Sequence, residues 1–172
     1  MKKILTFTAA CLITAALPVG VAAARASSVS GLDEQYLTTA MKGDLFEMAG
    51  GKIALRKSHN PAVRKLASTL IKDHSQSYKQ SASLARRLGV DVPDAPTLSQ
   101  AWQLKVASRM AASTFNHWWS SLECLDHGQD ISETTDEVNN GSNTEVRKDA
   151  KNELPMLHRH LNLSRAALRA SK

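Results

Sequence analysis

Residues 60–89 read NPAVRKLASTLIKDHSQSYKQSASLARRLG and carry the clearest structural signal in the chain. Asn60 followed by Pro61 is a strong helix start, because the asparagine side chain caps free backbone N–H groups and proline loses no hydrogen bond there. Apolar residues then recur every three or four positions, and most basic residues lie elsewhere around the helix. Gly89 is a typical helix end. The pattern predicts an amphipathic helix that ends at Leu88 and packs its apolar face on other helices.

The rest of the chain repeats this helical spacing. Helices are predicted at residues 32–57, 99–110 and 113–139, and a last helix opens at residues 142–145, where Ser-Asn-Thr-Glu is a capping-box pattern. Residues 90–96 contain two prolines and predict a linker. No segment alternates with period two for long enough to suggest a sheet. Four helices of roughly 25 residues would each be about 40 Å long. The sequence therefore predicts an all-α antiparallel four-helix bundle with an additional short helix.

The N-terminus has the layout of an export signal. Lys2 and Lys3 precede an apolar run at residues 4–17, which small residues follow. The run is shorter than the roughly 20 apolar residues that span a bilayer. We predict a signal peptide at residues 1–26, cleaved near Ala26, and a location in the periplasm or cell envelope.

The chain that remains after cleavage, residues 27–172, is expected to form one bundle domain with a single core. Loss of Lys2, Lys3 and Arg25 lowers the formal net charge from +6 to +3. No stripe of basic residues interleaved with aromatics is present, so a nucleic-acid partner is excluded. Cys124 is the one cysteine left, which excludes an intramolecular disulfide.

Several short strings along the chain are similar to the motifs of one protein family. They are Glu47-x-x-x-Gly51-x-x-Ala54, Asn60-Pro61-x-Val63, Asp73-His74, Phe115, Asp126-His127 and Leu154-Pro155-x-Leu157-x-x-His160-Leu161. Together they resemble the bacterial exported ferritin-like proteins that are grouped as domain-of-unknown-function family 4142. The resemblance covers nearly all of the chain after residue 26, in the right order.

This resemblance implies a ferritin-like four-helix bundle and a location in the cell envelope. Carried over position by position, it marks Glu47, Asp73, His74, Asp126, His127 and His160. The chain departs from the family pattern at residues 115–119, where Phe-Asn-His-Trp-Trp stands in place of the usual Phe-Asp-x-x-Tyr. A role that needs this carboxylate or phenol is therefore not carried over.

A metal site is the sharpest chemical hypothesis. The candidate ligands lie one on each long helix and are Glu47, His74, His127 and His160. Imidazole and carboxylate suit zinc, copper or iron, and a bundle core commonly holds such a site. The spacing from Leu70 and Tyr78 places His74 on the apolar face, where an imidazole needs a partner or stays neutral. We place Asp73 and Asp126 behind the ligands, as their outer partners.

Other arrangements of the same residues stay open. A ferritin-type di-iron site is disfavoured, because neither His74 nor His127 has a glutamate three residues before it. Glu123 and His127 are four residues apart and share a helical face, which permits a different single-metal arrangement. The same groups could instead form a buried hydrogen-bond network that fixes the helix register.

The sequence offers no catalytic signature. It contains neither Gly-x-Ser-x-Gly nor the haem attachment sequence Cys-x-x-Cys-His. We therefore expect in the first place a non-enzymatic envelope protein with an interaction or stress-related role. Its partner would be another envelope protein or a second copy of the chain, and membrane attachment is the less favoured option. The alternative is a metal-binding or metal-dependent redox protein that holds a divalent zinc, copper or iron ion in the bundle core.

Overall fold

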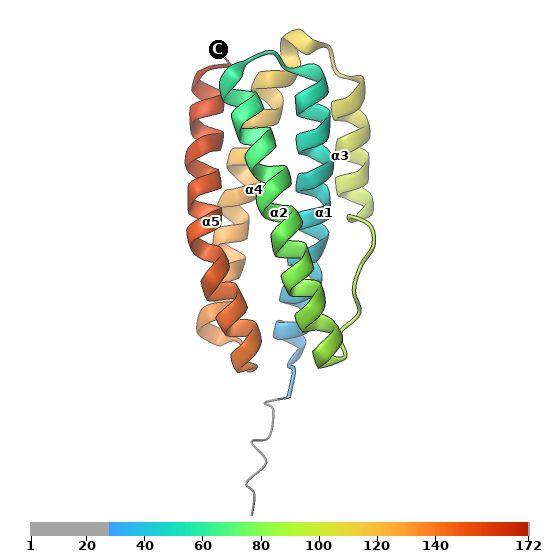
Figure 1. The fold of residues 1–172 in the computed structure, drawn as a ribbon, viewed down its shortest axis with the longest axis vertical. Helices are drawn as coiled ribbons and strands as arrows, with labels where there is room; N and C mark the ends of the chain where they lie inside the picture. The colour runs from blue at the N-terminus through green and yellow to red at the C-terminus, as the bar shows by residue number, and fades with distance from the viewer. Residues whose placement is uncertain (1–27, 172) are drawn as a thin grey trace, which may run out of the picture.

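The structure is a computed structural model that describes residues 28–171 as five α-helices (Figure 1). Their bounds are α1 Gly31–Lys57, α2 Pro61–Leu88, α3 Leu98–Arg109, α4 Ala112–Asn140 and α5 Thr144–Arg169. Each predicted helix is present, with ends within one or two residues of those expected. The predicted signal peptide and its cleavage point near Ala26 lie outside the described residues. Within that part of the chain, no helix is long and apolar enough to cross a membrane.

The four long helices form an antiparallel bundle. In Figure 1, α1 and α5 run in one direction while α2 and α4 run in the other. α1 packs against α2 and α4, and α5 packs against the same two helices. The linker after α2 and the short helix α3 lead the chain back along α1 to the end where α4 begins (Figure 1). A bundle with one long crossover is the ferritin-like arrangement, so the predicted fold class is confirmed.

Capping residues mark both ends of α2 and the beginning of α5. The Asn60 side chain accepts hydrogen bonds from the N–H groups of Ala62 and Val63, and Gly89 ends α2 with a left-handed φ of 74°. The predicted capping box at the start of the last helix is wrong in detail. Asn143 is the cap there, since its side chain accepts from the second and third N–H groups of α5, and the N–H group of Ser142 donates to Asp33 Oδ1 on α1.

Two adjacent glycines allow close helix packing. A Cβ atom on Gly51 would lie 2.8 Å from Ile71 Cγ1 and 2.9 Å from the carbonyl oxygen of Ala67, both on α2. A Cβ atom on Gly50 would lie 3.4 Å from Trp119 Nε1 on α4. The lack of a side chain at Gly50 and Gly51 therefore allows α1 to approach α2 and α4 closely.

The core consists of two apolar clusters with a polar layer between them. The first cluster contains Ile53, Ala54, Val63, Leu66, Ala67, Leu70, Ala107, Phe115, Trp119 and Ala167. The second contains Tyr36, Leu37, Met41, Ala82, Leu84, Ala85, Val90, Val146 and Ala150. In the middle of the long helices, between the two, Asp44, Glu47, His74, Ser77, Glu123, His127 and His160 are buried. Because burying unpaired polar groups is costly, this layer is the candidate functional site.

Candidate metal centre

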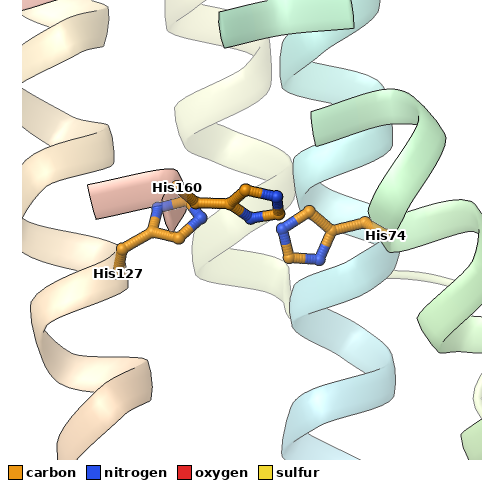
Figure 2. A group of neighbouring side chains, drawn as sticks. All are labelled: His74, His127 and His160. Carbon is orange, nitrogen blue, oxygen red and sulfur yellow. The ribbon is translucent and has the colours of Figure 1, made fainter. Parts of the chain in front are cut away.

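Three histidines from three helices meet in the polar layer. His74 lies on α2, His127 on α4 and His160 on α5, and none is more than 3% exposed. Figure 2 shows their rings turned toward one another between these helices. The ring centroids are 5.0 to 5.8 Å apart. One nitrogen from each ring lies within 4.8 Å of the other two, so the three side chains could hold a metal ion.

The outer nitrogen of each ring has a hydrogen-bond partner. His74 Nδ1 lies 2.7 Å from Asp44 Oδ1, and His160 Nε2 lies 3.1 Å from Asp73 Oδ2. His127 Nδ1 lies 2.9 Å from the backbone carbonyl oxygen of Glu123. A carbonyl oxygen only accepts hydrogen bonds, so His127 donates from Nδ1. Partners of this kind fix the ring orientation and the tautomer of metal-ligating histidines in proteins.

The inner nitrogens are buried and unpaired. His74 Nε2, His127 Nε2 and His160 Nδ1 have no hydrogen-bond partner within the described residues. Leaving a buried polar atom unsatisfied costs about 1–3 kcal/mol. Three such atoms turned toward one point therefore need an explanation, and a shared cation at that point satisfies all three.

The three imidazoles are neutral at neutral pH. Burial lowers the pKa of His74 to about 4 and that of His160 to about 4. Burial, with the neighbouring histidines, lowers the pKa of His127 to about 3. Neutral imidazole is the form that binds metal, so the lone pairs of the inner nitrogens are free for coordination.

A second group of candidate ligands adjoins the histidines. Glu47, Glu123 and His127 each offer an atom within 4.8 Å of the other two, and all three side chains are buried. Burial and the negative charges of Glu123 and Asp126 raise the pKa of Glu47 well above its usual value. Burial also raises the pKa of Glu123, to about 8. Both carboxyl oxygens of Glu47 lack a hydrogen-bond partner among the described residues, and the raised pKa values favour the protonated form of both glutamates when no cation is near.

Asp44 and Asp73 differ in their surroundings. Burial raises the pKa of Asp44 well above its usual value, although the Ser77 hydroxyl donates to Oδ2 at 3.0 Å and lowers it. Burial raises the pKa of Asp73 as well, but hydrogen bonds from Arg159 and His160 outweigh this effect and lower it. Asp73 is therefore an ionised acceptor for His160, while a cation at the histidines would favour the ionised form of Asp44.

The space beside His74 is small. The cavity that touches His74 has a volume of about 40 Å³ and is also lined by Tyr36, Asp44, Asp130 and Glu153. A drug-sized ligand needs roughly 300 Å³ or more, whereas a water molecule occupies about 30 Å³. This cavity therefore accommodates water or a small ion.

The structure brings the sequence-predicted residues together in two overlapping groups. His74, His127 and His160 form one, while Glu47 joins Glu123 and His127 in the other. Asp73 contacts His160, and the charge of Asp126 acts on Glu47 and Glu123. His158, two residues before His160, is exposed.

Asp44 was not predicted from the sequence, and Glu123 was predicted only as an alternative ligand. Asp44 follows Leu37 and Met41 at spacings of four and three, which places it on the buried face of α1. A buried carboxylate needs a hydrogen-bonding or charged partner, so the position of Asp44 on this face predicts that a polar side chain such as a histidine lies nearby. No sequence pattern pairs it with His74, because that contact joins residues 30 positions apart.

Comparisons with known proteins agree with this fold. The chain belongs to the family described as Domain of unknown function (DUF4142), whose sequence profile matches residues 19–166. No curated protein matches the chain in sequence. The crystal structure of a DUF305 fragment from Deinococcus radiodurans is similar in fold, with a TM-score of 0.72 and 13% sequence identity. The match covers 83% of this chain and 98% of that fragment.

Proposed function

We propose that this member of the domain-of-unknown-function family 4142 binds one divalent transition-metal ion at His74, His127 and His160. The observation that carries the proposal is the convergence of three buried, unpaired imidazole nitrogens. Imidazole is a ligand for zinc, copper, iron and nickel, which defines the class of ion. The export predicted from the N-terminus would place this activity in the cell envelope.

A purely structural hydrogen-bond network accounts for the outer nitrogens but not for the inner ones. Such a network stabilises a core when every buried donor and acceptor is paired. Here His127 Nε2 and His160 Nδ1 are left as acceptors, because a backbone carbonyl and the ionised Asp73 accept from the other ring nitrogens. At most one N–H group, that of His74 Nε2, faces these two acceptors, so a network of these side chains leaves at least one of them unpaired, whereas a cation between them satisfies both. We therefore favour metal binding over the interaction role that the sequence predicted first.

A small rotation of the histidine rings would bring the inner nitrogens to the separation that a metal ion requires. Nitrogens bound to tetrahedral zinc at 2.0–2.1 Å lie about 3.4 Å from one another. The ligand nitrogens lie within 4.8 Å of one another, so rotation of the rings brings them into range. Three histidines leave the fourth position of a tetrahedral ion open for water or a carboxylate, and Glu47 and Glu123 adjoin the histidines through His127. An ionised glutamate there also offsets the positive charge of the ion.

The small cavity favours holding an ion over converting a substrate. The space at His74, about 40 Å³, accommodates water or an ion but no organic molecule of ordinary size. The protein would therefore bind, store or pass on a metal ion, and any redox chemistry would be confined to the ion itself.

The direct experiment replaces one ligand by an apolar residue of similar size. We expect His127→Leu, in a chain comprising residues 27–172, to lose stoichiometric binding of Zn²⁺ in equilibrium dialysis followed by elemental analysis. Because the change also removes an unpaired buried nitrogen, the metal-free variant should unfold at a denaturant concentration equal to or above that of the parent. His158→Ala is the matched control, since it removes an exposed histidine from α5, and it should bind as the parent does.

The structural-network alternative predicts the reverse pattern. If His127 serves only the packing of the core, His127→Leu should leave metal content unchanged and lower the stability of the metal-free chain by about 1–3 kcal/mol. That result, or equal loss of metal in His158→Ala, would contradict the proposal.

A further inference from the structure

The short helix α3 presents an apolar stripe to solvent. Leu98, Trp102 and Val106 are spaced four residues apart and are 92%, 63% and 36% exposed. They extend over about 12 Å at 1.5 Å per residue. Exposed apolar residues are normal when scattered, but a continuous stripe that includes an indole marks an interaction surface.

The opposite side of α3 is fixed to the bundle. Ala107 is buried in the first apolar cluster, and Leu104 packs against it. Lys57 at the end of α1 donates a hydrogen bond of 2.8 Å to the carbonyl oxygen of Met110, next to the end of α3. The helix therefore holds its outward face in one orientation.

The stripe is flanked by positive charge. Lys105 and Arg109 are exposed, and the segment Leu98–Arg109 contains no acidic residue. The ammonium group of Lys105 lies 5.4 Å from the centre of the Trp102 ring. A surface hollow of about 320 Å³ is lined by Trp102, Lys105, Val106, Arg109 and Met110. Two cationic groups thus stand beside apolar side chains in one hollow.

We propose that α3 is a membrane-contact helix that lies against an anionic phospholipid surface. In this arrangement Lys105 and Arg109 contact lipid phosphates, and Trp102 sits at the level of the headgroups, where indole rings are favoured. Leu98 and Val106 reach the upper part of the acyl chains. Two basic residues attract an anionic surface only weakly, so the binding is loose and reversible.

The charge pattern argues against a second copy of the chain as the occupant. A symmetric dimer brings the same patch of each copy together. Lys105 and Arg109 of one copy would then face Lys105 and Arg109 of the other, and like charges disfavour that contact. An anionic lipid surface complements both the charge and the apolar stripe.

The test is cosedimentation with vesicles. It uses residues 27–172, which contain every described helix and both apolar clusters, and which lack the apolar run at residues 4–17. We expect the protein to sediment with phosphatidylglycerol vesicles at low salt, and not with phosphatidylcholine vesicles. Addition of about 0.5 M salt should release it, because the Debye length falls from about 30 Å at about 0.01 M salt to below about 5 Å.

Two variants test the patch and two controls match them. Trp102→Ser, and the double change Lys105→Glu with Arg109→Glu, should each lower the bound fraction at least about fivefold, the effect of roughly 1 kcal/mol. Leu125→Ser removes an isolated apolar residue that is 74% exposed on α4. Lys148→Glu with Lys151→Glu reverses two exposed charges on α5. Both controls should bind as the parent does, and circular dichroism checks that every variant is folded.

Each other outcome overturns the proposal. Equal binding to both kinds of vesicle, no binding to either, or unchanged binding by the α3 variants would show that α3 does not recognise anionic lipid. A dimer in sedimentation velocity that Trp102→Ser abolishes, without vesicle binding by the parent, would assign the stripe to a second copy instead.

Discussion

The Nδ1 atom of His127 lies 2.9 Å from the carbonyl oxygen of Glu123, one turn earlier on α4. Because that oxygen only accepts, the ring hydrogen is held on Nδ1 and the lone pair of Nε2 points into the core. The side chain of Glu123 lies in the adjoining group with Glu47. One turn of α4 therefore sets the tautomer of a candidate ligand and also supplies a carboxylate beside it.

Replacement of Asp44 should weaken metal binding without removing a ligand. In Asp44→Asn the partner of His74 Nδ1 loses its charge, so it no longer favours the metal-bound form of the ring. We expect about 10- to 100-fold weaker binding in a competition titration with a chelating dye. Asp91→Asn is the control, because Asp91 is exposed in the linker after α2, outside the centre. Unchanged affinity in Asp44→Asn would contradict the orienting role of Asp44.

Metal binding should release protons at neutral pH. Burial raises the pKa of Glu123 to about 8 and that of Glu47 well above its usual value, so both carry protons until a cation displaces them. The apparent affinity should rise by up to about tenfold per pH unit for each proton released, and the contribution of Glu123 should level off above about pH 8. Calorimetry at pH 7 in buffers of different ionisation enthalpy counts these protons, and Glu123→Gln should release fewer. Binding without proton release would rule out this coupling.

The metal-free protein should lose stability in alkaline solution. The pKa of Glu123 is raised from 4.5 to about 8 by burial, so its folded form holds a proton that the unfolded chain has lost. This contribution is fully present below pH 4.5 and disappears as the pH rises through 8. Denaturant unfolding at pH 6 and pH 9 with a chelator should show a fall on the order of a few kcal/mol. Glu123→Gln should reduce the fall and the exposed control Glu145→Gln should not, whereas an equal fall in all three proteins would refute this assignment.

The two glycines of α1 predict opposite results for the same substitution. Gly51→Ala should lower the free energy of unfolding by about 1–3 kcal/mol, because the new Cβ meets the Ala67 carbonyl oxygen at 2.9 Å. Gly43→Ala meets nothing within 4 Å and should be neutral or stabilise the helix by up to about 1 kcal/mol. Urea unfolding of both variants measures the difference. Equal effects would show that α1 and α2 are not in close contact at Gly51.

The fold could be predicted from the sequence because its signals are local. Asn60, Pro61 and Gly89 define the ends of α2 through neighbouring backbone groups, and the apolar spacing between them defines its buried face. The cap at residues 142–145 was misassigned by one residue, because serine and asparagine are both good caps and the sequence does not show which side chain reaches the free N–H groups.

The candidate site could be predicted only in part. His74, His127 and His160 stood out as polar residues in helical segments, and the family resemblance marked them. The pairing of His74 with Asp44 depends on the rotation of α2 against α1, and the grouping of Glu47 with Glu123 depends on the height of α1 against α4. The residue spacing within one helix determines neither its rotation nor its height relative to a neighbouring helix.

The most direct test of the metal centre is X-ray absorption spectroscopy of residues 27–172 loaded with one equivalent of Zn²⁺. The account predicts three imidazole nitrogens at about 2.0–2.1 Å, a shell that is unchanged in His158→Ala and loses one imidazole in His74→Leu. A shell of oxygen atoms without imidazole, or the same number of imidazoles in His74→Leu as in the parent, would contradict the assignment of His74, His127 and His160 as the ligands.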